Sequence, residues 1–334
     1  MGIYRCNKCG TVAEHNYMAG MDPVACKQCG NMVAVYDTPF FVQKLLERYM
    51  ATVRELKALQ AVEAEQEQSD SPEVNHEHGG WLEEDIHNSS ALANAEQHKP
   101  IANWLAAQNA KAVFDYSAVD MSGYFDEAAQ SLGEHYALTE DLLGKINWSY
   151  RKKHTGLNVD LGKMSQKDGQ ALNQLCRQFY SHTLFAGYFY QKQDKVIRLK
   201  LQRASKIENF FSGAWLEWFA LNILLQQAQE KGKNYSFSCA RNVKLEFANE
   251  DVHELDVVWL SQRKTPVIVE CKSGEFRRDI EKYIRLRKRL NVSASHFIIL
   301  ATDIEDMDSV AMSSMYELTF LNIKGFGEYI ARLL

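Results

Sequence analysis

The clearest pattern of apolar and polar positions lies in the last third of the chain. Its first part predicts a long helix from about Ile207 to Lys231. Short apolar runs bounded by polar residues then predict three strands, a helix and a fourth strand: Tyr235–Phe247, Glu254–Leu260, Pro266–Cys271, Phe276–Asn291 and His296–Ala301. Helix, three strands, helix, strand is the order of a compact α/β core.

A mainly helical region precedes this core. The apolar spacing predicts helices near Ile101–Ala110, Tyr124–Leu132, Glu140–Lys153 and Gln166–Tyr180. Residues Gly187–Leu201 are strand-like and predict a hairpin that turns at Gln193 and Asp194. A helix followed by a basic hairpin is compatible with a winged-helix module, in which one helix enters a nucleic-acid groove and the hairpin follows the backbone.

The region before residue 100 combines a heptad-like stretch with a polar one. From Pro39 to about Gln68, apolar residues recur close to every 3.5 positions, which predicts a helix and suggests a short coiled coil. Residues 69–100 contain breakers and little apolar content, so we interpret them as a linker. His76, Glu77 and His78 could bind metal, but no scaffold fixes them, and a polar linker is the preferred interpretation.

Length and composition set the limits of the domain organisation. A chain of 334 residues predicts two or three domains. We divide it into residues 1–38, 39–68, 69–100, 101–203 and 204–334. Nearly half of the residues are apolar and 24% are charged, as in a soluble globular protein. Because no apolar run is long enough to span a bilayer and no signal peptide is evident, we expect a cytoplasmic protein.

Four of the seven cysteines predict a metal site near the N-terminus. Cys6, Cys9, Cys26 and Cys29 form two CxxC pairs, each followed directly by glycine. This spacing fits a closed, tetrahedral zinc site, and residues 1–38 are therefore expected to form a zinc ribbon. So small a domain cannot bury enough surface to fold unaided, which favours a structural role for the zinc. Iron in a rubredoxin-like redox site and nucleic-acid recognition by the ribbon are the alternatives.

Charged residues at the ends of two predicted core strands indicate a second metal site. The β-branched run Val267–Val269 leads directly into Glu270 and Lys272, whose side chains share one face of the strand. Asp256 lies on the preceding strand, and the turn Ser261–Thr265 folds the two strands into a hairpin. Two neighbouring carboxylates suit Mg²⁺ or Mn²⁺. Such a metal polarises a phosphate and activates water, while Lys272 orients the water and stabilises negative charge.

These residues resemble the PD-(D/E)xK, or restriction-endonuclease-like, superfamily of nucleases, over about the final third of the chain. The stretches Phe210–Glu217, Glu254–Val257 and Glu270–Gly274 look most like the nuclease domain of CRISPR-ancillary effectors that cyclic oligonucleotides activate. The sequence departs from the superfamily pattern at Leu255, which replaces the proline of its name.

The resemblance implies an αβββαβ core and hydrolysis of phosphodiester bonds in DNA or RNA, in defence against phage or mobile elements. It implies four catalytic residues, Glu217, Asp256, Glu270 and Lys272. Asp256 and Glu270 would bind the metal, the carbonyl of Cys271 would complete its shell, and Glu217 would be an additional acidic residue of the site.

The net charge of −5 means that a nucleic-acid surface must be local. The helix after the predicted site supplies one, since Arg277, Arg278, Lys282 and Arg285 can contact phosphates; a solvated helix face is the alternative. A single nuclease centre cuts one strand, so we expect a homodimer. The competing function is a non-catalytic nucleic-acid-binding or scaffold protein with a nuclease-like fold.

Overall fold

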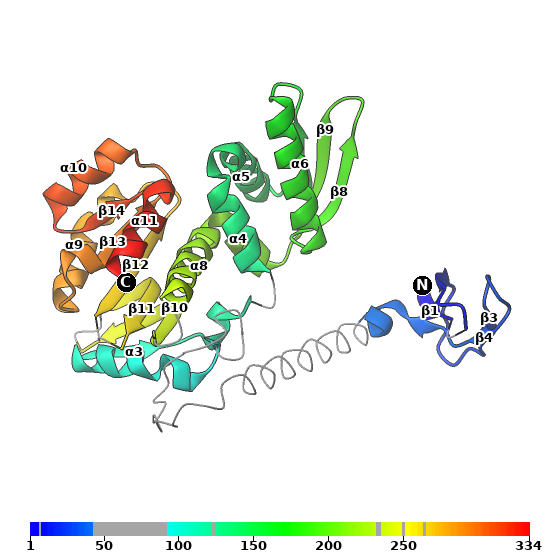
Figure 1. The fold of residues 1–334 in the computed structure, drawn as a ribbon, viewed down its shortest axis with the longest axis horizontal. Helices are drawn as coiled ribbons and strands as arrows, with labels where there is room; N and C mark the ends of the chain where they lie inside the picture. The colour runs from blue at the N-terminus through cyan, green and yellow to red at the C-terminus, as the bar shows by residue number, and fades with distance from the viewer. Residues whose placement is uncertain (7, 43–91, 122–123, 232–234, 249–250, 263–264) are drawn as a thin grey trace, which may run out of the picture. The chain divides into compact units, whose positions relative to one another are not determined.

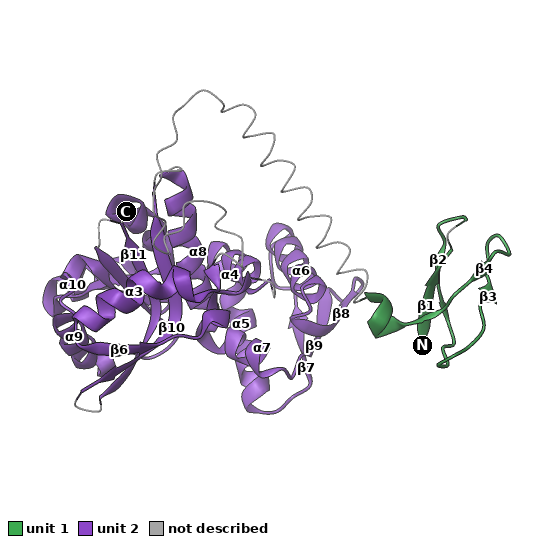
Figure 2. Ribbon diagram, turned by 90° about the horizontal axis from the view of Figure 1, so that it is seen from below, with its two compact units in different colours: residues 1–76 green, residues 77–334 purple. Residues whose placement is uncertain are grey.

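The computed structural model describes all residues except 7, 43–91, 122–123, 232–234, 249–250 and 263–264. The chain separates into two compact units, residues 1–76 and 77–334 (Figure 2). In the described part, no helix is both long and apolar enough to cross a membrane. The helix expected from Pro39 is present at residues 38–42, and its continuation to residue 68 lies outside the described residues, as do His76, Glu77 and His78.

The N-terminal unit is built from short strands. The strands β1 (Gly2–Arg5), β2 (Val12–His15) and β5 (Tyr36–Asp37) form an antiparallel sheet in the order β2-β1-β5. The strands β3 (Val24–Ala25) and β4 (Met32–Val33) form a separate hairpin. Among the described residues of this unit, the buried apolar cluster consists of Tyr4, Cys6, Cys26, Val33 and Val35. A core this small stabilises a fold weakly.

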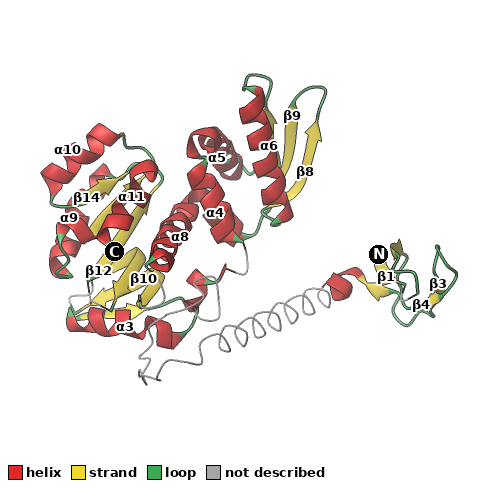
Figure 3. Ribbon diagram, in the orientation of Figure 1, coloured by secondary structure: helices red, strands yellow, loops and turns green. Residues whose placement is uncertain are grey.

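A six-stranded mixed sheet dominates the second unit (Figure 3). Its order is β14-β13-β12-β11-β10-β6. The strands are β6 (Ala110–Val113), β10 (Phe237–Phe247), β11 (Val252–Ser261), β12 (Pro266–Lys272), β13 (Phe297–Ala301) and β14 (Thr319–Leu321). Strands β6, β10, β11 and β12 pair antiparallel, whereas β12, β13 and β14 pair parallel.

Helices cover both faces of this sheet. One core joins it to α8 (Trp215–Glu230) and α11 (Ile323–Leu333), and a second core joins its other face to α3 (Ala95–Ala107) and α9 (Ile280–Arg289). The helix α10 (Asp306–Tyr316) precedes β14 and contacts it. Strands covered on both faces have no solvent side, which explains why β13 is apolar and buried at every position.

A smaller three-stranded sheet follows the first helices of this unit (Figure 1). Its strands β7 (Gly156–Asp160), β8 (Phe185–Gln191) and β9 (Val196–Leu201) pair antiparallel in the order β7-β9-β8. The helices are α4 (Phe125–Glu134), α5 (Tyr136–Arg151) and α6 (Gln166–Ser181). Ser165 caps α6, since its hydroxyl accepts a hydrogen bond from the Asp168 N–H.

The order of elements expected in the last third is present, but the first helix is interrupted. It consists of α7 (Ser205–Asn209), a π-helical turn η3 at Phe210–Ala214, and α8. π-helical turns often mark functional sites. The final helix of the predicted core is also shorter than expected, because a 3₁₀ turn η4 (Arg277–Asp279) precedes α9.

Two further differences concern the residues around 100. The helix expected over Ile101–Ala110 begins at Ala95 because the Asn94 side chain caps it by accepting from the Gln97 N–H. Ala110 already belongs to β6, which pairs with β10 and was not predicted. The domain limits expected at residues 38, 68, 100 and 203 stay predictions.

Candidate active site

The site begins where two central strands separate. Strands β11 and β12 pair from Leu260 and Pro266 as far as Val257 and Val269, and the pairing stops there. Beyond this point the Asp256 carboxylate accepts a hydrogen bond from the Cys271 N–H at 2.7 Å. A side chain thus replaces the backbone acceptor that a continued ladder would provide. The separation leaves room for side chains between the two strands.

Lys272 lies between two carboxylates at this opening. Its Nζ is 3.0 Å from Asp256 Oδ2 and 3.3 Å from Glu270 Oε2. Glu270 is only 2% exposed, and its Oε1 has no hydrogen-bond partner among the described residues. A buried carboxylate oxygen without a partner is costly. The structure therefore brings Asp256, Glu270 and Lys272 together, as the sequence predicted.

Burial and crowding change the ionisation of this cluster. Burial, followed by the negative charge of Asp256, raises the pKa of Glu270 to about 8. Burial alone would lower the pKa of Lys272, but Glu270 and Asp256 raise it above its usual value. One internal ammonium thus faces two carboxylates. An added cation would relieve the repulsion between them.

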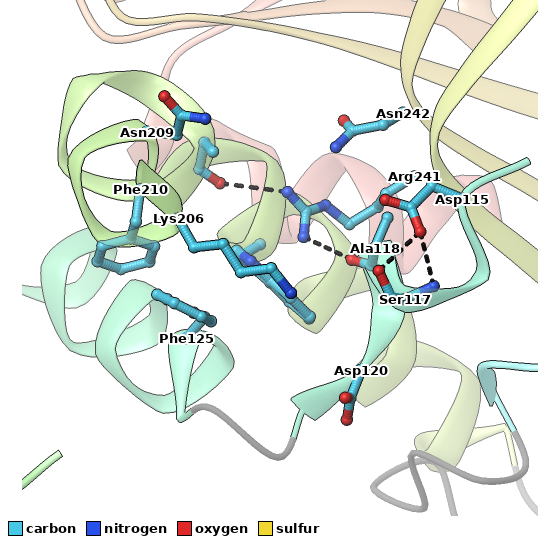
Figure 4. A pocket seen from close by; sticks show the side chains of 12 residues that line it. Asp115, Ser117, Ala118, Asp120, Phe125, Lys206, Asn209, Phe210, Arg241 and Asn242 are labelled. Carbon is cyan, nitrogen blue, oxygen red and sulfur yellow. Dashed lines mark hydrogen bonds between the residues drawn. The ribbon is translucent and has the colours of Figure 1, made fainter. Parts of the chain in front are cut away.

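Glu217 reaches the same region from the first turn of α8 and is held by a buried arginine. Its Oε2 is 2.7 Å from one terminal nitrogen of Arg241 on β10. The other terminal nitrogen of Arg241 donates a hydrogen bond to the Ala118 carbonyl (Figure 4). The guanidinium also lies 4.1 Å from the ring centroid of Trp218. Burial raises the pKa of Glu217; Arg241 lowers it and Asp256 raises it. The electrostatic interaction with Asp256 associates Glu217 with the carboxylate cluster.

Sequence reasoning missed Arg241, although a signal was present. The residue is 3% exposed and ends the run Phe237–Arg241, in which every position is buried and the only other polar residue is Ser238. A charged residue in such a run needs a partner, just as Glu270 does. The acidic partner, Glu217, comes from a helix 24 positions away in the sequence. Local patterns do not show that pairing.

The basic helix α9 contacts the cluster through an aromatic residue. The Lys272 Nζ lies 5.4 Å from the ring centroid of Tyr283, a residue that the sequence analysis did not single out.

The predicted phosphate-contacting residues Arg277, Arg278, Lys282 and Arg285 are all exposed. Arg277 forms an ion pair with Glu275, and Lys282 and Arg285 contribute to lowering the pKa of His253 after burial. Three basic residues at the end of α9 are ion-paired: Arg287 and Lys288 with Glu317, and Arg289 with Asp251.

The π-helical turn lies against the segment that follows Lys272. The Ser273 hydroxyl is 3.5 Å from the Ser212 carbonyl oxygen. A Cβ added at Gly213 would lie 3.2 Å from the same hydroxyl, which is closer than most contacts of this kind. The turn therefore fixes the segment after Lys272 against the start of α8.

The N-terminal unit contains a separate cluster of four thiols. The Sγ atoms of Cys6, Cys9, Cys26 and Cys29 lie within 4.8 Å of one another and can hold a metal ion. The distances Cys6–Cys29 and Cys9–Cys26 are 3.5 Å and 3.7 Å, close to the ~3.8 Å expected between sulfurs 2.3 Å from a tetrahedral zinc. Hydrogen bonding with the side chain and backbone of Thr11 lowers the pKa of Cys9 to about 6. An ionised thiol at neutral pH is a metal ligand.

The two thiol pairs have the same backbone geometry. The N–H of Gly10 donates to the Cys6 carbonyl, and the N–H of Gly30 donates to the Cys26 carbonyl, both at 2.9 Å. Both glycines have positive φ, 75° and 71°, which residues with a side chain rarely adopt. The glycine after each CxxC pair therefore allows the turn that points both sulfurs to one side.

Comparisons with known proteins give no sequence match and two structures of partial similarity. Neither a family model nor a curated protein sequence matches this chain. The structure of protein VC1899 from Vibrio cholerae is similar with a TM-score of 0.47 and 18% identity, over 70% of this chain and 60% of that chain. Can2 from Sulfobacillus thermosulfidooxidans, in complex with cyclic tetra-adenylate, gives a TM-score of 0.47 and 14% identity, over 70% and 59%. This chain thus matches about three fifths of the length of either structure.

Proposed function

We propose that this protein is a divalent-metal-dependent nuclease of the PD-(D/E)xK type that hydrolyses phosphodiester bonds of DNA or RNA. One observation carries the proposal: Asp256, Glu270 and Lys272 meet where β11 and β12 separate, and Glu270 Oε1 has no partner in the described part of the chain. The resemblance of these residues to nucleases of CRISPR-ancillary effectors supports a role in defence.

The donor set at the opening fits a hard cation. All its side-chain ligands are carboxylate oxygens, which Mg²⁺ and Mn²⁺ prefer over the sulfur and nitrogen ligands of zinc sites. We assign Asp256, Glu270 and the Cys271 carbonyl to hold this ion, with Glu217 as the further acidic residue. When bound, the ion polarises the scissile phosphate and lowers the pKa of a water.

The protein's own groups position the reaction. Lys272 stays protonated at neutral pH because both carboxylates raise its pKa, so it stabilises the negative charge that develops on the phosphate. Tyr283, whose ring lies over the Lys272 ammonium, restricts where that ammonium can move. Arg241 holds Glu217 through a hydrogen bond and restrains its side chain. Arg277, Arg278, Lys282 and Arg285 bind the flanking phosphates.

Cleavage of labelled single- and double-stranded DNA and RNA tests the proposal, with Mg²⁺, Mn²⁺ or EDTA. We expect metal-dependent cleavage that is lost in Glu270→Ala and Lys272→Ala and kept in Lys324→Ala, which changes an exposed lysine elsewhere in this unit. Each removed catalytic group should lower the rate by a factor on the order of 10² or more. Cleavage that persists in both site variants would contradict the assignment.

One observation favours a non-catalytic alternative. Lys272 already neutralises part of the charge of both carboxylates, as in a structural ion-pair network. A protein of that kind would bind nucleic acid, remain folded and not cut under any metal condition. The same cleavage assay, combined with a binding measurement, separates the two functions.

The helical region supports nucleic-acid binding through a winged-helix arrangement. The order α5, β7, α6, β8, β9 and the sheet order β7-β9-β8 are compatible with such a module. The exposed face of α6 carries Lys167, Gln170, Gln174 and Arg177. Side chains of these types contact phosphates and base edges in protein–DNA complexes. Lys167→Ala and Arg177→Ala should weaken duplex binding, and unchanged affinity in both would contradict this role.

Assembly and the N-terminal metal complete the proposal. Two active sites are needed to cut both strands of a duplex, so we propose a homodimer, and a monomeric mass by light scattering would contradict it.

We assign zinc to Cys6, Cys9, Cys26 and Cys29, because the two pairs form a closed cluster of sulfur ligands.

A further inference from the structure

A pocket of about 400 Å³ is lined by Arg241 (Figure 4), which forms the ion pair with Glu217 and lies opposite Val257, the residue after Asp256. The segment Asp115–Asp120, the helix α7, the π-helical turn and β10 form its walls. The volume falls within the ~300–1,000 Å³ that small-molecule sites occupy. One nucleotide is of this size class.

Two cationic side chains line this pocket. The Arg241 guanidinium is buried and fixed by its contacts with Ala118 and Glu217, but its Nε has no hydrogen-bond partner among the described residues. Lys206 is exposed, extends from α7 into the pocket in Figure 4, and forms no ion pair with any described residue. A buried donor without a partner and a free ammonium favour an anionic group such as a phosphate.

The remaining wall contains the carboxylates of Asp115 and Asp120 together with an aromatic ring and two amides, and the ring and the amides are groups that can bind a base. The ring of Phe125 borders the pocket and is partly exposed, with its centroid 5.2 Å from that of Phe210. The amides of Asn209 and Asn242 line the same pocket. Aromatic rings stack on bases of any sequence, and amides form hydrogen bonds with base edges. Phosphate-binding and base-binding groups therefore occur in one pocket.

A second pocket, of about 500 Å³, lies on the other side of the π-helical turn. Arg151, Tyr150 and Ser212 line it, and Asn209 borders both pockets. The Ser212 carbonyl contacts Ser273, the residue after Lys272. A nucleic-acid strand that runs from one pocket to the other thus crosses the π-helical turn, which contacts the segment after Lys272.

We propose that the pocket lined by Lys206, Arg241, Asn209 and Phe125 binds one nucleotide of the substrate strand, adjacent to the phosphodiester presented to Asp256 and Glu270. Lys206 and Arg241 contact its phosphate, and its base stacks on Phe125. The second pocket receives the strand on the other side of the turn. This inference rests on the proposed nuclease function, but it makes a claim about binding that does not require cleavage.

Binding of fluorescein-labelled oligonucleotides to the full-length protein, in buffer without added Mg²⁺ or Mn²⁺ and without chelator, tests the proposal in the absence of turnover. Lys206→Ala should weaken binding of single strands about fivefold to twentyfold and reduce the slope of log Kd against log salt by about 0.7, because one phosphate contact is lost. Lys324→Ala, the control, should change neither quantity. Equal affinity of Lys206→Ala and Lys324→Ala at every salt concentration would overturn the proposal, as would the absence of binding to the native protein.

A second variant reports on the base. Oligonucleotides that carry 2-aminopurine at successive positions should show quenching by stacking at one position, and Phe125→Leu should remove that quenching while keeping an apolar side chain of similar size. Quenching that is unchanged in Phe125→Leu would contradict the stacking assignment. If Lys206→Ala weakens binding but the native protein never cuts, the pocket stands and the nuclease proposal fails. If Lys272→Ala abolishes cleavage but Lys206→Ala leaves the affinity for oligonucleotides unchanged, the nuclease proposal holds and the nucleotide-binding role of the pocket is wrong.

Discussion

At the scale of single residues, Glu270 is the group whose ionisation decides what the site can bind. Burial and the charge of Asp256 raise its pKa to about 8, so near neutral pH it holds a proton for much of the time. A protonated carboxyl group is a poor metal ligand, and an incoming cation must displace the proton. Proton and metal therefore compete for the same side chain.

This competition predicts a steep pH dependence of metal binding. The affinity for Mn²⁺ should fall roughly tenfold for each pH unit below 8 and level off above it, because only the deprotonated form binds. Isothermal titration with Mn²⁺ at pH about 6 and about 8.5 measures the difference, with released protons detected in buffers of different ionisation enthalpy. Glu270→Gln, which has no proton to lose, should bind weakly at both values. An affinity independent of pH in the native protein would contradict the metal-ligand role of Glu270.

At the scale of elements, a close contact between α4 and α8 fixes the helix that carries Glu217. A Cβ added at Gly133 on α4 would lie 2.2 Å from ring atoms of Phe219 on α8, and Phe219 is buried. The two helices can approach this closely only because position 133 has no side chain. Phe219 follows Glu217 by two positions, so a displacement of α8 here would move the acidic residue.

Alanine substitution should therefore have opposite effects at two helical glycines. Gly133→Ala should destabilise the protein by about 1–3 kcal/mol through overpacking. Gly144→Ala, on the exposed side of α5 with no atom within 4 Å of the added Cβ, should stabilise it by about 0.5–1 kcal/mol by favouring the helix. Urea unfolding followed by circular dichroism measures both changes. A change of the same sign in the free energy of unfolding of both variants would contradict the packing argument.

The elements that sequence could predict are those whose patterns are local. The runs around Val267–Val269 and Phe297–Ala301 are apolar because helices cover both faces of their strands, and this is visible in the sequence. The approach of Asp256 to Glu270 followed from strand alternation and a short turn. The π-helical turn at Phe210–Ala214 was not predictable, since it depends on contacts such as that between Ser212 and Ser273. Strand β6 pairs with β10 across more than a hundred residues, so its pattern gave no sign of its partner.

At the scale of the whole molecule, the two units have different sources of stability. The second unit has two large apolar cores, whereas the apolar cluster among the described residues of the first consists of five residues, two of which are thiols of the Cys6, Cys9, Cys26 and Cys29 cluster. A domain with so little apolar surface gains little folding free energy from its core, and we propose that a metal held by the four thiols supplies the rest.

Removal of this metal should unfold one unit and leave the other intact. We expect one equivalent of zinc per chain by elemental analysis; iron would instead favour the redox alternative. After treatment with a zinc chelator, the amides of β1 and β2 should lose protection against hydrogen exchange, while those of β10, β11 and β12 keep it. Cys26→Ser should reproduce the loss, and Cys176→Ser, which changes a buried thiol of the second unit, should retain the metal. Coincident loss of protection in both units would contradict independent stabilisation.

The Lys272 ammonium already occupies the position of a cation between Asp256 and Glu270 before any metal binds. A metal ion that enters must take carboxylate oxygens from Lys272, and Lys272 then needs another anion within reach. A phosphate of the substrate is such an anion. Metal and substrate should therefore bind with positive cooperativity, each raising the affinity for the other by the same factor, as thermodynamic reciprocity requires. Without nucleic acid, the proposed site would then bind little metal. Nucleic acid would raise the metal occupancy, so the rate of hydrolysis would depend on the substrate concentration through metal binding as well as through substrate binding.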